Sequence, residues 1–190
     1  MKTAISTLAV IAILALLAYT YAYSGYYDIG ADVPHSPATY RFLSMARSRS
    51  IQHHAQSISV PNLDDQALIL KGAGQYAAMC TECHLAPGMS HSELRAGLYP
   101  QPPVLGKEPI DPREAFWIIK HGIKLTAMPA WGATHDDQTI WSIVAFVRKL
   151  PGMTPAQYKD IVAKAPPDED MDMGHDNDDM HDMHDGMHSQ

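Results

Sequence analysis

The chain has 190 residues, only two cysteines and a formal net charge of −7 at pH 7, which fits one domain with appendages and excludes a framework of disulfides. The charge is uneven, since residues 166–190 carry −9 and the remaining residues carry +2. Nucleic-acid binding needs a basic footprint, so this balance argues against a nucleic-acid partner.

The first predicted element is an apolar helix at the N-terminus. Residues 3–23 contain no charged side chain and would span about 31 Å as a helix, which is enough to cross a bilayer. Tyrosines cluster at its far end, which is typical of the membrane interface, and Lys2 is the only charge before it. A cleaved signal peptide is the alternative, with Thr20-Tyr21-Ala22 as a weak cleavage site. We favour an uncleaved anchor, and either interpretation places the rest of the chain on the outer side of the membrane.

Residues 24–63 are predicted to form a connector with one amphipathic helix. Ser36 and Pro37 begin this helix, which is expected to reach Ile58. It either docks on anionic lipid headgroups or a membrane partner, or it is a spacer that packs on the next domain or stays exposed, and we favour the spacer. The apolar positions are Phe42, Met45, Ala46 and Ile51, and the polar ones include Arg41, Arg47 and Arg49.

The most informative motif is Cys80-Thr81-Glu82-Cys83-His84. Two cysteines separated by two residues and followed by histidine form the attachment signature of c-type haem. Each thiol can form a thioether with one haem vinyl group, and the imidazole that follows can bind the iron from below the ring. A disulfide across so short a loop would stabilise little, and the chain has no second cysteine pair to complete a zinc site. The motif therefore predicts one covalent haem c.

The residues around this motif predict a helical domain over 64–165. Residues 85–111 are rich in proline and glycine and are expected to be mostly loop. A loop of this length needs a core to pack against, and the haem supplies one. Aspartates and a proline mark the helix starts, and glycines mark some of the ends. The predicted helices run from Asp64 or Asp65 to Met79, from Asp111 to Lys120, from Asp136 or Asp137 to Leu150, and over residues 155–164.

About residues 64–150 resemble a class I cytochrome c. Gly72 and Tyr76 precede Cys80 at helical spacing, and in the family such residues let the first helix cross the last one closely. Residues 102–106, Pro-Pro-Val-Leu-Gly, resemble the family's Pro-x-Leu segment, where a proline carbonyl accepts a hydrogen bond from the proximal histidine. Pro103 is the preferred acceptor, with Pro102 as the alternative. The resemblance implies an all-α class I cytochrome c fold, with three to four helices around one covalently attached haem.

Residues 124–131 resemble the family segment that carries the distal methionine. Met128 lies 44 residues beyond His84, between two predicted helices. An isolated methionine ordinarily packs in a core, but the matching segment favours ligation of the haem iron, with His121 and His91 as alternatives. Iron bound by histidine and methionine has no vacant position, which implies an electron carrier and not an enzyme.

Residues 166–190 are predicted to be a disordered tail rich in Met, His and Asp. Thioether sulfur suits Cu(I), while imidazole suits Cu(II), zinc or nickel. Three Met-His pairs close together therefore predict metal capture, with copper favoured, and an acidic solvated tail is the alternative. The candidate copper ligands are Met180, His181, Met183, His184, Met187 and His188.

These features predict a monohaem c-type cytochrome in the bacterial inner membrane, with its haem domain facing the periplasm. It would pass single electrons between redox partner proteins, with no catalytic residues and no small-molecule substrate. The alternatives are a copper-handling protein whose haem serves copper redox chemistry, and a cytochrome subunit of a dehydrogenase or oxidase complex. The predicted parts are the anchor or signal peptide (1–23), the connector (24–63), the cytochrome domain (64–165) and the tail (166–190).

Overall fold

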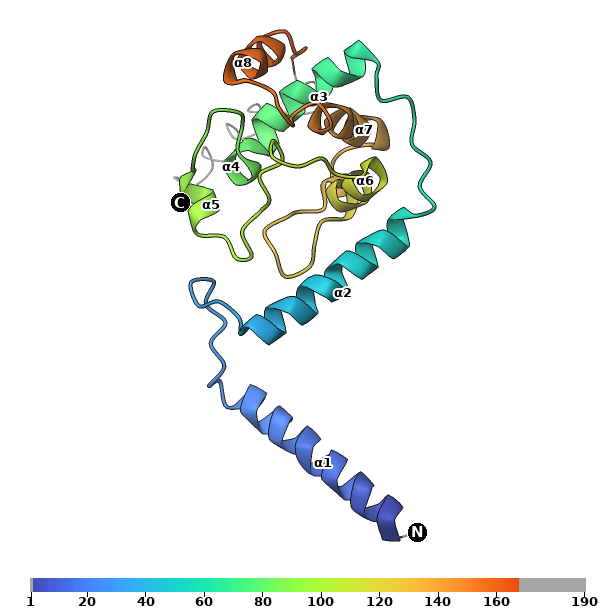
Figure 1. Ribbon diagram of the computed structural model, residues 1–190, viewed down its shortest axis with the longest axis vertical. Helices are drawn as coiled ribbons and strands as arrows, with labels where there is room; N and C mark the ends of the chain where they lie inside the picture. Colours follow the sequence, from blue (N-terminus) through green and yellow to red (C-terminus); the bar gives the residue numbers. More distant parts are fainter. Residues whose placement is uncertain (1, 168–190) are drawn as a thin grey trace, which may run out of the picture. The chain divides into compact units, whose positions relative to one another are not determined.

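The computed structural model describes residues 2–167, and all regular structure within them is helical (Figure 1). This confirms the all-α prediction. The chain divides into two compact units, Met1–Leu43 and Ser44–Gln190. The predicted tail, from residue 168 onward, lies outside the described residues.

The first unit contains α1 (Lys2–Tyr23). The side chains of residues 3–23 are all exposed. This helix is long and apolar enough to cross a membrane, a criterion that a signal sequence also meets. Tyr21 lies near the end of α1, and its ring centroid is 6.2 Å from that of Tyr26 and 6.4 Å from that of Tyr27. The helix therefore fits a membrane anchor with aromatic side chains at one end.

α2 (Pro37–Ala55) begins where the sequence predicted and ends three residues before Ile58. Of the predicted apolar positions, Ile51 is buried, whereas Phe42 and Met45 are 63% and 51% exposed. The packed face contains Ile51 and Ala55, with Arg47 half-buried beside them. These three residues repeat every four positions and so lie on one side of the helix, which places Arg47 on the packed face and not on the polar one.

The core of the second unit is built where α3 (Gln66–Met79) crosses α7 (Asp137–Val147). Asp65 caps α3 and Asp136 caps α7, each accepting hydrogen bonds from backbone N–H groups in the first turn. The two helices approach closely at Gly72, where an added Cβ would lie 1.8 Å from the backbone oxygen of Ser142. Only glycine permits this approach, as the resemblance implied.

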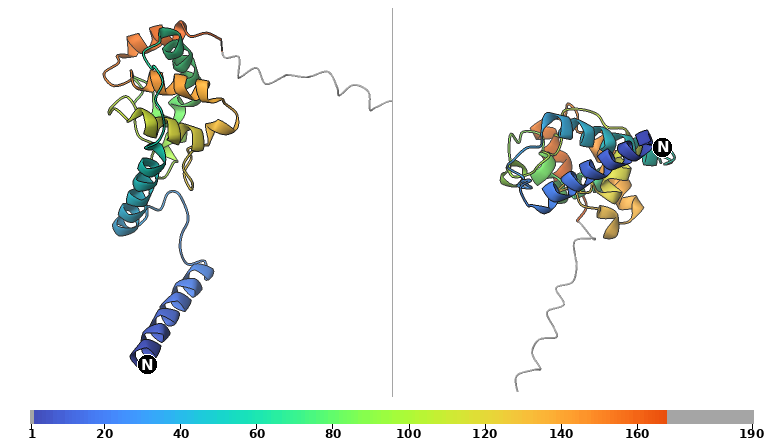
Figure 2. Two further views of the ribbon diagram at one scale, coloured as in Figure 1. Left: turned by 90° about the vertical axis from the view of Figure 1, so that its right-hand side faces the viewer. Right: turned by 90° about the horizontal axis from the view of Figure 1, so that it is seen from below.

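Within the second unit the helices that follow α3 gather around this crossing, with two short ones on the long stretch between α3 and the next long helix (Figures 1 and 2). α6 (Pro112–His121) has Asp111 as its cap and proline at its start, as predicted, and Gly122 follows it as the C-cap. α7 ends at Val147, three residues before the predicted Leu150, and the 3₁₀ turn η1 (Trp131–Ala133) was not predicted. The other elements are α4 (Thr81–His84), α5 (Glu93–Ala96) and α8 (Pro155–Ala163).

Candidate functional site

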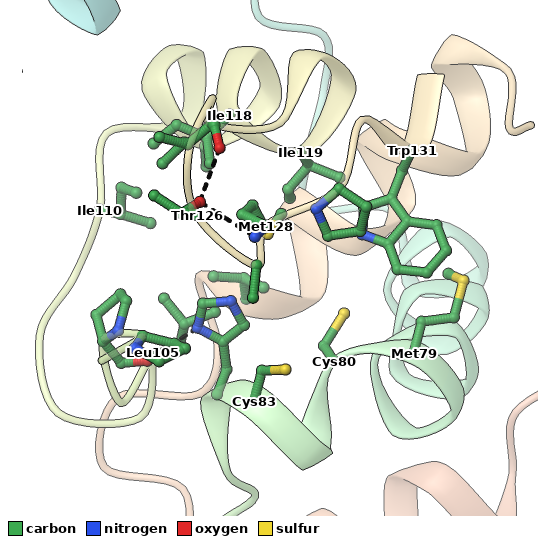
Figure 3. A pocket seen from close by; sticks show the side chains of 18 of the residues that line it. Met79, Cys80, Cys83, Leu105, Ile110, Ile118, Ile119, Thr126, Met128 and Trp131 are labelled. Atoms are coloured by element: carbon green, nitrogen blue, oxygen red, sulfur yellow. Dashed lines mark hydrogen bonds between the residues drawn. The ribbon is translucent and has the colours of Figure 1, made fainter. Parts of the chain in front are cut away.

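A cavity in the second unit brings the cysteine motif and the segment around Met128 to opposite walls (Figure 3). Its empty space, including the part open to solvent, is about 960 Å³. Most of the lining is aliphatic or aromatic, so the cavity suits a large apolar ligand. The aliphatic lining includes Leu105, Ile110, Ala115, Ile118, Ile119, Ile123 and Val147.

A single helical turn positions both cysteines. The N–H of Cys80 donates to the carbonyl oxygen of Tyr76 at the end of α3, and the N–H groups of Cys83 and His84 donate to the carbonyl oxygen of Cys80 at 3.2 and 2.8 Å. The two sulfur atoms consequently point into the same cavity (Figure 3). Burial raises the pKa of the Cys80 thiol to about 12 and also raises that of Cys83, so both are neutral, and no disulfide joins them.

His84 is oriented by a backbone carbonyl. Its Nδ1 lies 2.9 Å from the carbonyl oxygen of Pro103, which can only accept a hydrogen bond. Nδ1 therefore carries the proton, and Nε2 keeps its lone pair. Burial lowers the pKa of His84 more than this hydrogen bond raises it, and the charge of Arg95 lowers it further. The imidazole is thus held neutral, which is the form that binds metals.

Of the two candidate prolines, Pro103 is the one that faces the histidine. The carbonyl oxygen of Pro102 accepts a hydrogen bond from Nη2 of Arg95 at 2.8 Å instead. Arg95 also donates from Nη1 to Gln101 at 2.6 Å. The loop that carries both prolines is therefore fastened by Arg95, a residue that the sequence did not single out.

The backbone around the cysteine motif is supported from within the core. The hydroxyl of the buried Tyr76 donates to the carbonyl oxygen of Leu85 at 2.7 Å. Leu85 has a φ of 62°, which is rare for a residue with a branched side chain. The hydroxyl of Ser92 donates to the carbonyl oxygen of Glu82. These contacts fix the chain on both sides of His84.

Met128 is presented to the cavity by a loop that folds back on itself. Gly122 ends α6 with a φ of 64°, and an added Cβ would lie 2.7 Å from the backbone oxygen of Met128. The N–H of Ile123 donates to that same oxygen at 3.1 Å. The hydroxyl of Thr126 donates to the carbonyl oxygen of Ile123 and accepts from the N–H of Met128. Figure 3 shows Met128 across the cavity from Cys80.

Thr126 is a positioning residue that the sequence analysis missed. A threonine two residues before a functional side chain can close a local turn through its hydroxyl, and that signal was present. His121 and His91, the alternatives to Met128, are both exposed and do not line the cavity. The His121 ring lies against Trp117 instead, with 5.1 Å between the ring centroids.

The donor set fits a covalently attached haem. An apolar cavity holds two neutral thiols, and the same cavity holds a neutral imidazole and the thioether of Met128. The six candidate copper ligands, in contrast, all lie outside the described residues. Within residues 2–167 no group of three or more His, Cys, Asp or Glu side chains is arranged to hold a metal ion.

Residues 67–147 match the family model of cytochrome C oxidase, cbb3-type, subunit III. The matched segment begins in α3 and ends with the last residue of α7, so it contains all five predicted haem-site residues. No curated protein and no solved structure matches the chain significantly.

Proposed function

Because residues 67–147 are a c-type cytochrome haem domain, we propose that the chain is a membrane-anchored monohaem cytochrome that acts as a one-electron carrier. In this proposal α1 holds the protein in the bacterial inner membrane, with the haem domain on the periplasmic side. The chain itself carries out no bond-making reaction on a substrate.

The observation that carries the proposal is the donor set around one apolar cavity. We assign covalent attachment of haem to Cys80 and Cys83, and binding of its iron to His84 and Met128. When bound, the haem supplies the exchange of one electron between ferric and ferrous iron. The protein chain contributes the rest: it binds the haem, orients the side chains that bind the iron, and keeps water out of the cavity.

Three features of the chain would tune that exchange. The Pro103 carbonyl fixes the tautomer and the ring orientation of His84. The thioether of Met128, as an iron ligand together with the imidazole of His84, would favour the reduced iron and raise the potential. The aliphatic lining limits the access of water to the cavity. The additional positive charge of ferric iron would therefore be stabilised less than it is in water.

The partner proteins are a second part of the proposal. The matching family model is that of an oxidase subunit, cbb3-type subunit III. This supports a place for the chain beside oxidase subunits, either as a component of the complex or as a carrier that delivers electrons to it. Purification of the chain from solubilised membranes, with identification of the copurifying haem proteins, separates a stable subunit from a free carrier.

We also propose that the tail binds copper through Met180, Met183 and Met187, with the neighbouring histidines in support. This is the feature that would favour the alternative function, copper handling. The comparison is the Cu(I) affinity of the full chain against a variant with these three methionines changed to leucine. Equal affinities would leave the acidic tail without a copper role and would leave the electron carrier unaffected.

Electron transfer itself is tested by spectroelectrochemistry of the purified full-length protein. We expect one haem per chain and a single reversible one-electron transition between two low-spin spectra. A high-spin spectrum, or rapid binding of carbon monoxide by the reduced protein, would indicate a vacant iron position and would contradict the carrier assignment.

A further inference from the structure

One charged side chain lines the haem cavity. Arg47, on α2, is the only Lys, Arg, Asp or Glu side chain among the described residues that line it. Arg47 is half-buried, and no described Asp or Glu forms an ion pair with it. A guanidinium in apolar surroundings is costly unless an anion or hydrogen-bond acceptors satisfy it. Its position therefore calls for a negatively charged partner inside the cavity.

Packing of α2 holds Arg47 in this place. Ile51 and Ala55, one and two helical turns further on, are buried with 7% and 2% exposure. The His54 ring stacks on Trp117 of α6, with 5.6 Å between the centroids and 9° between the planes. The segment 44–55 is therefore fastened to the same helix that supplies Ile118 and Ile119 to the cavity. Arg47 lies on the packed face of α2 and cannot simply turn into solvent with the rest of the helix.

We propose that Arg47 binds a carboxylate of the haem. The inference rests on the proposed haem function and adds to it a binding residue from outside the matched segment 67–147. A haem carries two carboxylates on an apolar ring, and a guanidinium can grip one of them with two parallel hydrogen bonds. The connector helix is then a wall of the haem site and not a passive spacer.

Three of the other polar groups in the cavity are already bonded within the chain. Gln101 accepts from Arg95 at 2.6 Å. The Thr126 hydroxyl is bonded to the loop that presents Met128, and Nδ1 of His84 is bonded to Pro103. Arg47 is consequently the side chain best suited to neutralise a carboxylate there. A positive charge at this position also favours the ferrous iron over the ferric iron by electrostatics.

The test compares the haem-loaded full chain with Arg47→Gln, Arg47→Lys and the matched control Arg49→Gln. Arg49 is on the same helix but exposed, so its loss changes the net charge equally. In Arg47→Gln we expect the ratio of reduced to oxidised protein at a fixed ambient potential to fall by a factor on the order of 5 to 30, as 1–2 kcal/mol would produce. The resonance Raman bending band of the haem carboxylates should shift as well. Arg47→Lys should keep most of the wild-type potential, and Arg49→Gln should keep both properties.

Two results would overturn the inference. The first is an Arg47→Gln protein whose potential and carboxylate band both equal those of Arg49→Gln. The second is a lowered potential with an unmoved carboxylate band, which would reduce Arg47 to a structural part of α2. A chain that carries no haem would overturn the proposed function together with this inference, whereas either result on haem-loaded protein overturns this inference alone.

Discussion

Replacing Gly72 with alanine tests the helix crossing that holds the Cys80 end of α3 in place. A Cβ at this position would lie 1.8 Å from the backbone oxygen of Ser142 and 3.0 Å from Cβ of Phe146. Carbon and oxygen atoms approach without strain to about 3.3 Å. The two helices would therefore have to move apart by roughly 1.5 Å, because backbone atoms cannot rotate away as a flexible side chain can.

The cost follows from two opposing effects. Alanine improves the helix propensity of α3 by about 1 kcal/mol relative to glycine. Separating the helices weakens the dispersion contacts around Tyr76 and Phe146, since a gap of about 0.5–1 Å already forfeits a quarter to a half of each contact. Overpacking costs roughly 1–3 kcal/mol and occasionally more, and a clash with backbone atoms at 1.8 Å, together with the lost dispersion, places this site at about 3–5 kcal/mol. We expect a net destabilisation of about 2–4 kcal/mol and a fall in Tm of roughly 8–20 °C.

The assay is thermal unfolding of the haem-loaded protein, followed by circular dichroism. Gly74→Ala is the matched control, because an added Cβ there would meet Ala165 at 3.1 Å and no backbone atom closer than 3.8 Å. We expect Gly74→Ala to stay within about 1 kcal/mol of the wild type. A Gly72→Ala protein as stable as this control would refute the argument that close crossing of α3 and α7 requires glycine.

Three further predictions concern the proposed methionine ligand, the support of the cysteine motif, and acid stability. Met128→Leu keeps the approximate side-chain volume but removes the sulfur, so the near-infrared band of methionine-bound ferric haem should disappear and the reduction potential should fall. The control Met153→Leu should change neither, and a band retained in Met128→Leu would show that another residue binds the iron. Tyr76→Phe leaves the carbonyl of Leu85 without its donor and should cost about 1–3 kcal/mol in urea unfolding, and no loss would mean that this hydrogen bond is dispensable. The pKa of Asp136 is lowered by the hydrogen bonds it accepts at the start of α7. Its contribution to the free energy of unfolding is therefore fully present above its pKa in the unfolded chain, and it is lost as the pH falls through its pKa in the folded protein. Asp136→Asn should flatten the acid side of the stability curve, and an unchanged curve would contradict this.

The helix starts were predictable because their signals are local. Asp65, Asp111 and Asp136 each cap a helix with a side chain that bonds the next backbone N–H groups. Two helix ends were misplaced by three residues, at Ala55 and Val147. Neither end has a glycine or proline directly after it, so tertiary packing decides where the helix stops.

The proposed haem-site residues could be predicted from the sequence where the chemistry of attachment fixes their spacing. Cys80 and His84 fall in one helical turn, so the motif alone places them together. Arg47 was assigned to a polar face because an amphipathic pattern does not say which neighbour a helix meets. Arg95 bonds to the backbone carbonyl of Pro102 across a loop, and no periodicity in the sequence marks such a contact. Thr126 bonds locally to Ile123, so its turn signal was present in the sequence and was overlooked.

The most direct test of the account is mass spectrometry of the denatured full-length protein, followed by peptide mapping. We predict that one haem stays attached after denaturation and acid-acetone extraction, and that it is found on the peptide containing Cys80 and Cys83. Removal of both thiols should abolish this attachment. A denatured wild-type chain with two unmodified cysteines, and a haem that extracts freely, would contradict the account.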